Sequence, residues 1–137
     1  MTQDSAQELR FAIQRLARRI RAMQATDVTE SQRTVIFTLH NEGPQTLSSL
    51  SAHEQVTPPS MNRTVNALVA AGLVTRITAE DDARKVKVEL SDAGREFVRE
   101  TRRQRDAWFT TQLAALPAAQ RKLLEQATPI LKELANK

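Results

Sequence analysis

Apolar residues recur at every third or fourth position along most of this chain, which is the period of amphipathic helices. The pattern predicts helices over residues 5–24, 29–43, 47–55, 58–71, 92–115 and 117–134. In the second and third helices, the side chains predicted to face a core are those of Val35, Ile36, Leu39, Leu47, Leu50 and Ala52. Pro129 lies inside the last helix and predicts a kink or a break near Thr128.

Residues that favour helix ends stand where the periodic stretches begin and stop. Thr29 and Gln32 have the spacing of a capping box at the start of the second helix. Thr57 is a good N-cap for the fourth helix, and Pro58 then occupies the first helical position, where a missing N–H is no loss. Gly72 is expected to end that helix.

The period changes from helical to alternating near the middle of the chain. A short apolar run at 73–77 and the alternating stretch Lys85–Leu90 predict two strands. The polar loop 78–84 joins them, so they should form a β-hairpin. Ser91 follows as the N-cap of the long helix. The predicted fold class is therefore mainly α with a small β-hairpin.

Residues 46–90 have the element order of a winged helix-turn-helix, two short helices followed at once by a hairpin. In that arrangement the second helix enters the major groove of DNA. The apolar side of this helix, predicted to pack on the core, consists of Met61, Val65, Leu68 and Val69. The opposite side, predicted to face outward, consists of Pro59, Ser60, Arg63, Asn66, Ala67 and Ala70.

The outward side combines hydrogen-bonding side chains with small ones. Arg63 can pair with guanine O6 and N7 or with a phosphate, and Asn62 and Asn66 can serve adenine edges or the backbone. Ala67 and Ala70 would let the helix approach a groove without collision. The alternative is a solvated helix face without a ligand.

The first and last helices carry apolar stripes that lie far in sequence from the helix-turn-helix. The residues that we expect to form a dimer interface are Leu9, Ile13, Leu16, Ile20, Leu123, Leu124, Ile130, Leu131 and Leu134. In a monomer they would form an exposed apolar patch, which a symmetry mate would cover. The alternative is a helical bundle within one chain.

Charge and composition narrow the possibilities. The chain has 20 basic and 16 acidic residues, and arginines concentrate in helices 5–24 and 92–115, which is compatible with nucleic acid binding or with simple solvation. Without cysteine, disulfides and thiolate metal sites are excluded. The sequence lacks both a run of about 20 apolar residues and a signal-peptide h-region, so we expect a soluble, cytoplasmic protein with no membrane partner.

The sequence gives little support for catalysis, metal binding or cofactor binding. There is no phosphate loop rich in glycine, no nucleophile–base pattern and no H-x-x-x-H spacing, so an enzyme is not expected. His40 and His53 stand alone, near the ends of the second and third helices, where helix capping or a partly buried hydrogen bond is the better interpretation. The sequence predicts no metal site and no cofactor.

Several stretches resemble the multiple-antibiotic-resistance regulator (MarR) family. Residues 56–63 and 68–76 look like its recognition helix and first wing strand. The run Asp82-Ala83-Arg84-Lys85 is similar to the family's D-x-R wing signature, and residues 88–94 are similar to its L-[ST]-x-x-G entry into the long helix. Helix order and length match over essentially the whole chain.

The resemblance implies one domain over residues 1–137, with a DNA-binding winged helix-turn-helix lobe at 29–91 and dimerisation helices at 5–25 and 92–137. It implies a homodimer on a pseudo-palindromic double-stranded operator. The residues that it places on DNA are Thr57, Pro59, Ser60, Asn62, Arg63, Asn66, Arg84 and Lys85. Arg76 and Asp82 would support the wing. The acidic run Glu80-Asp81-Asp82 departs from the family's pattern. Its carboxylates are expected to pair in part with Arg84 and Lys85, so that the wing contributes less to DNA binding.

The expected function is a sequence-specific, DNA-binding transcriptional regulator, a repressor released by a small ligand. A small aromatic or phenolic compound is the candidate ligand implied by the resemblance, with no binding residues identified. Trp108 and Phe109 could line such a cavity, but core or dimer packing is favoured for both. Two alternatives remain: a winged-helix protein–protein interaction module that does not bind DNA, and an architectural DNA-binding protein without an effector.

Overall fold

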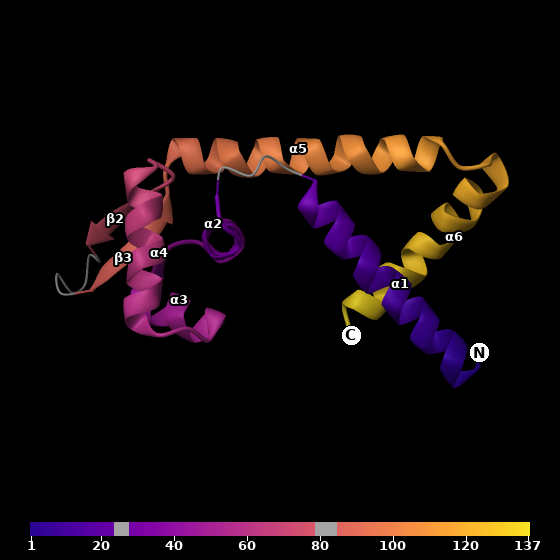
Figure 1. The fold of residues 1–137 in the computed structure, drawn as a ribbon, viewed down its shortest axis with the longest axis horizontal. Coiled ribbons are helices and arrows are strands. Elements are labelled where there is room, and N and C mark those ends of the chain that lie inside the picture. Colours follow the sequence, from indigo (N-terminus) through magenta and orange to yellow (C-terminus); the bar gives the residue numbers. More distant parts are fainter. Residues whose placement is uncertain (24–27, 79–84) are drawn as a thin grey trace. The chain divides into compact units, whose positions relative to one another are not determined.

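The structure is a computed structural model, which describes residues 1–23, 28–78 and 85–137. Along the chain its elements are α1 (Gln3–Ala22), α2 (Glu30–Glu42), β1 (Gln45–Thr46), α3 (Leu47–Glu54), α4 (Pro58–Ala70), β2 (Val74–Thr78), β3 (Val86–Leu90), α5 (Asp92–Ala114) and α6 (Ala118–Ala135) (Figure 1). The predicted fold class, mainly helical with a small antiparallel sheet, is confirmed. Within the described residues, no helix combines the length and the apolarity needed to span a membrane.

The chain divides into two compact units. One comprises Met1–Gln24 and Arg103–Lys137 and so contains α1, α6 and the C-terminal part of α5. The other, Ala25–Arg102, contains α2, α3, α4, the sheet and the N-terminal part of α5. The residues expected to read DNA and those expected to form a dimer therefore belong to different units.

The sheet has three strands in the order β1-β3-β2, with both pairings antiparallel. In the hairpin, Val74 pairs with Leu90 and Thr78 with Val86, and on the other edge Gln45 pairs with Val88. The sequence predicted a hairpin of two strands only. The structure corrects this prediction by adding a third strand, β1, to the sheet. A strand of two residues has no pattern of its own, because its pairing with β3 alone defines it.

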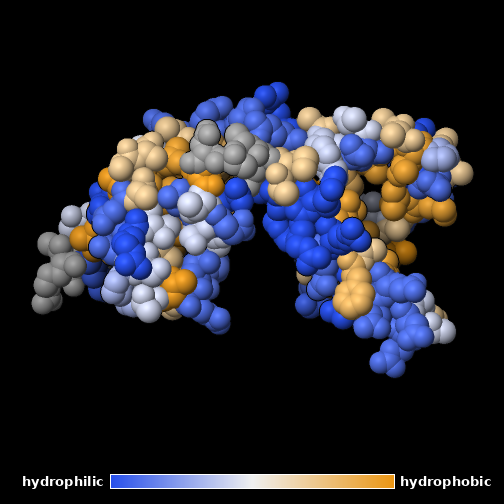
Figure 2. All heavy atoms as spheres, in the orientation of Figure 1, coloured by the Kyte–Doolittle hydropathy of each residue, from blue (hydrophilic) through white to orange (hydrophobic). Residues whose placement is uncertain are grey.

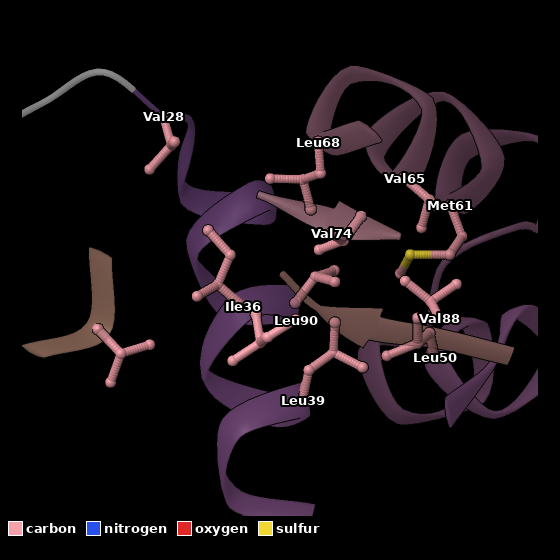
Figure 3. Packing of buried hydrophobic residues seen from close by; sticks show 12 residues of the cluster. Val28, Ile36, Leu39, Leu50, Met61, Val65, Leu68, Val74, Val88 and Leu90 are labelled. Atoms are coloured by element: carbon pink, nitrogen blue, oxygen red, sulfur yellow. The ribbon is translucent and has the colours of Figure 1, made fainter. Parts of the chain in front are cut away.

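The core of the second unit is formed where α2, α3, α4 and α5 pack on the sheet. Ile36, Leu50, Val65 and Val88 are fully buried (Figure 3). Val98 of α5 belongs to the same core and is 1% exposed. Burial of each such side chain contributes about 1.5–3 kcal/mol. The inward orientation predicted for Val35, Ile36 and Leu39 is confirmed.

The prediction of a core-facing side chain is wrong for two residues, Val69 and Ala52. Leu47 is only partly buried against the core. Val69 is 37% exposed, because Met61, Val65 and Leu68 define the buried stripe of α4 and Val69 lies about 100° further round the helix than Leu68. Ala52 of α3 is also exposed, and the neighbouring Ser51 is buried instead.

The predicted caps set the helix starts. Thr29 and Gln32 form the full capping box, with the Gln32 N–H donating to Thr29 Oγ1 and the Thr29 N–H donating to Gln32 Oε1, both at 3.1 Å. Thr57 Oγ1 accepts from the Ser60 N–H at 3.3 Å. α6 continues through Pro129, so of the kink or break predicted near Thr128 a break does not occur.

The end of α4 is joined closely to the start of α5. Gly72 has φ +76°, and after it the Leu73 N–H donates to the Leu68 carbonyl at 3.0 Å, which closes α4 as a Schellman motif. The Leu73 carbonyl then accepts from the Ser91 N–H at 3.1 Å. Ser91 Oγ caps α5 by accepting from the Gly94 N–H at 3.0 Å. These bonds fix the recognition helix, the wing and the long helix to one another within the second unit.

Candidate nucleic-acid interface

One side of α4 is held by the core and the other is open. Met61, Val65 and Leu68 point from α4 toward the strands that carry Val74 and Val88 (Figure 3). The predicted contact residues of α4 and its cap that are exposed are Thr57, Pro59, Asn62, Arg63 and Asn66, whereas Ser60 is partly buried. Ala67 and Ala70 are exposed beside them. The structure thus brings most of the predicted reading residues onto one surface.

The first turn of α4 offers a helix dipole but few free N–H groups. Pro58 and Pro59 have no N–H, and the N–H of Ser60 already donates to Thr57 Oγ1. The turn also has no acidic residue, so the positive end of the dipole is not neutralised locally. A phosphate at this end would therefore be bound by side-chain hydroxyls and by the Arg63 guanidinium, and it would be attracted by the positive end of the dipole.

The segment from the start of α4 to the end of β2 is uncharged except for two arginines. Residues 55–78 include Arg63 and Arg76 and no carboxylate. The arginines at the start of α5 differ, because Arg95 is paired with Asp92 and Arg99 with Glu96. The recognition helix and first wing strand therefore present positive charge that their own residues do not cancel, as a phosphate-binding surface requires.

Arg76, predicted to support the wing, reaches from β2 to the recognition helix. Its Nη2 donates to the side-chain oxygen of Asn66 and, at 3.5 Å, to that of Asn62. Lys85 is exposed directly before β3. The predicted wing residues Arg84 and Asp82 lie outside the described residues. The sequence did not indicate the Arg76 contacts, since they join positions 10 and 14 residues apart.

The end helices bury none of their residues within the chain, over Gln3–Ala22 and Ala118–Ala135. Apolar side chains at the predicted dimer positions are exposed instead, to 65% at Leu123 and 60% at Ile130, and patches of hydrophobic surface lie over part of α6 (Figure 2). The other exposed members of the set are Leu9, Ile13, Leu16, Leu124, Leu131 and Leu134, and Ile20 is partly buried. In the same unit Arg19 lies over the Trp108 ring, 5.7 Å from its centroid.

The surroundings of His53 differ from those expected. His53 has a carboxylate on each side, with Nε2 3.9 Å from Glu42 and Nδ1 3.5 Å from Glu54. Glu42 belongs to the end of α2, so only the fold brings it to His53. His40 is exposed in the last turn of α2. Across the described ranges no group of three or more histidines, cysteines and carboxylates could hold a metal ion.

A helix-turn-helix of α3 and α4, supported by α2 and followed by the β2–β3 wing, defines the class of this molecule: it is a winged helix-turn-helix protein. The family model that matches the chain, over residues 28–86, is that of the MarR family. An uncharacterised HTH-type transcriptional regulator of Mycobacterium bovis is 36% identical over 132 residues, which cover 96% of this chain and 92% of that protein.

Solved structures share the fold over nearly the full length. A transcriptional regulator of Thermotoga maritima has a TM-score of 0.86 at 17% identity, over 95% of each chain. A mutant of MepR of Staphylococcus aureus, bound to an oligodeoxyribonucleotide, has a TM-score of 0.71 at 18% identity, over 95% of this chain and 97% of that one. The chain belongs to the MarR family, and it is a DNA-binding transcriptional regulator.

Proposed function

We propose that this regulator is not an enzyme and that it binds a pseudo-palindromic operator as a homodimer, with one α4 helix in each of two successive major grooves. The observation that carries the proposal is the exposed side of α4, where Asn62, Arg63 and Asn66 stand together over a fully buried apolar stripe. A rigid helix with polar groups on its open side is what base reading requires. The exposed apolar residues of α1 and α6 support pairing with a second copy.

Arg63→Ala tests whether this helix reads sequence. The exposed guanidinium of Arg63 can donate to guanine O6 and N7, so its loss is expected to weaken binding to the preferred site by about 1–3 kcal/mol and binding to random duplex by less. Fluorescence anisotropy with the chain's own promoter region and with a shuffled duplex measures both affinities.

Arg99→Ala is the matched control, because it removes an exposed arginine of α5 that is paired with Glu96. It should leave the ratio of the two affinities unchanged. If Arg63→Ala instead weakens both duplexes equally and lowers the salt dependence, the side chain contacts phosphate and the assignment of base reading is wrong.

We further propose that the regulator is a repressor released by an aromatic carboxylate. Support comes from the first unit, where the Arg19 guanidinium lies over the partly buried Trp108 ring and offers both a cation and an aromatic surface. Micromolar-to-millimolar salicylate or benzoate is expected to raise the melting temperature of the free protein and to lower its operator affinity. Trp108→Leu should remove both effects. A melting temperature and an operator affinity that no tested carboxylate changes would exclude this class of effector.

A further inference from the structure

Arg76 is placed to act on the recognition helix because of its register in β2. Alternate residues of a strand share a face, so Arg76 is on the same face as Val74, which is 1% exposed against the core beneath α4. Arg76 itself is exposed, two residues further along the strand. Its side chain therefore extends from the covered face of the sheet to the open side of α4, where Asn62 and Asn66 follow one another at one helical turn.

The chemistry of the arginine fixes how the two asparagines are turned. A guanidinium has only donors, whereas a carboxamide has an accepting oxygen and a donating nitrogen. Asn62 and Asn66 must each point Oδ1 toward Arg76, and both oxygens accept from its Nη2. In a planar amide the nitrogen lies on the other side of Cγ. Each asparagine is thus left with its Nδ2 donors for any further partner.

This orientation matters for base reading. Asparagine recognises adenine by two bonds at once, in which Oδ1 accepts from N6 and Nδ2 donates to N7. With Oδ1 of Asn66 engaged by Arg76, that paired contact loses its accepting half. The guanine edge instead shows two acceptors, O6 and N7, and needs only donors. Arg63, which stands between the asparagines in sequence, is also a donor only.

We infer that Arg76 is a positioning residue that sets base specificity: by holding the Asn66 oxygen it makes Asn66 read guanine rather than adenine. The inference rests on the proposed function, since it presumes that α4 lies in the major groove. It assigns to the recognition helix a preference for guanine at the base pair that faces Asn66. Arg76 acts on this preference through Asn66 and need not touch the DNA itself.

The test is a selection of binding sites from a random duplex library with four full-length proteins: wild type, Asn66→Ala, Arg76→Ala and Thr75→Ala. Asn66→Ala locates the base pair that Asn66 reads, as the position at which preference falls by about fivefold or more. In the wild type this position is expected to be a G·C pair. In Arg76→Ala the freed oxygen should admit adenine, so that the guanine-to-adenine ratio falls toward one. Thr75→Ala, an exposed neighbour in β2, should keep the wild-type preference.

Side-chain amide spectra of the free protein provide a second measurement that needs no DNA. In ¹H–¹⁵N correlation spectra, the Nδ2 signals of Asn62 and Asn66 are expected to shift in Arg76→Ala and to stay in place in Thr75→Ala. Unchanged signals would overturn the inference, because the oxygens would then not be held in solution.

The selection has four contrary outcomes, and they are distinguishable. An Arg76→Ala protein that keeps the wild-type guanine preference overturns the inference and leaves the proposed function standing. An A·T pair at the position located by Asn66→Ala does the same. So does a preference that Asn66→Ala leaves intact at every position. If the wild type selects no sequence over random duplex while the amide signals shift as expected, the proposed operator reading fails and takes the inference with it.

Discussion

Leu123→Asp combined with Ile130→Asp is expected to give a monomer that binds its operator at least about 100-fold more weakly than the wild type. Both side chains are largely exposed in the single chain, and α6 buries none of its residues there. They are seven residues apart and so share a helix face. In a dimer their burial would place two unpaired carboxylates in an apolar interface, where desolvation of the charge is costly. Each monomer would then engage only one half-site, without the gain from linked binding.

Sedimentation velocity gives the mass of the variant, and anisotropy gives its operator affinity. The matched control is Lys132→Asp, which also introduces a carboxylate on α6 but lies about half a turn round the helix from both Leu123 and Ile130. It should remain dimeric. A double variant that still sediments as a dimer would show that α6 is not at the interface.

Gly94→Ala is expected to lower the free energy of unfolding by about 3 kcal/mol. A Cβ on Gly94 would lie 2.1 Å from the Leu73 carbonyl oxygen and 3.1 Å from Leu90 Cδ2. Because the first of these is a backbone atom, relief requires that α5 move away from the end of α4, which would strain the Ser91–Leu73 hydrogen bond. In an open helix the same change would stabilise by up to about 1 kcal/mol, since alanine is the better helix former. A loss of stability would therefore support the close approach of Gly94 to Leu73, and a gain in stability would contradict it.

Thermal and urea unfolding measure this change, with a melting temperature expected to fall by about 10 °C or more. Ala93→Gly is the control, since Ala93 is an exposed neighbour in the same turn. That change should cost only about 0.5–1 kcal/mol, from backbone entropy. A Gly94→Ala protein as stable as the wild type would mean that α5 does not approach Leu73 this closely.

The parts of the fold that local chemistry determines were predictable from the sequence. The capping box at Thr29, the start of α4 at Pro58 and the glycine that ends it depend on residues a few positions apart, and each was predicted where the structure has it. Two of the features that were missed are products of distant contacts. β1 exists only through its pairing with β3, and the carboxylate of Glu42 comes to His53 from another helix.

In the candidate site, too, local spacing was predictable from the sequence and contacts between distant residues were not. Helical spacing was enough to place Arg63 and Asn66 on the open side of α4, and the family resemblance added Asn62, which is also exposed. It could not show that Arg76 holds the two asparagines. These side chains meet only because the chain reverses at Gly72, between α4 and β2. The signal that could have found the contact is a donor-only residue on the inward-facing register of β2, opposite two amides one turn apart on α4. The DNA contacts themselves, those of Arg84 and Lys85 included, remain predictions.

The most direct test of sequence-specific regulation compares the wild-type protein on two duplexes of equal length at about 150 mM salt. One is the chain's own promoter region and the other is the same composition in shuffled order. We expect the dimer to bind the promoter at least about 1,000-fold more tightly, as sequence-specific regulators do. Equal affinities for the two duplexes would contradict the assignment of α4 as a helix that reads sequence.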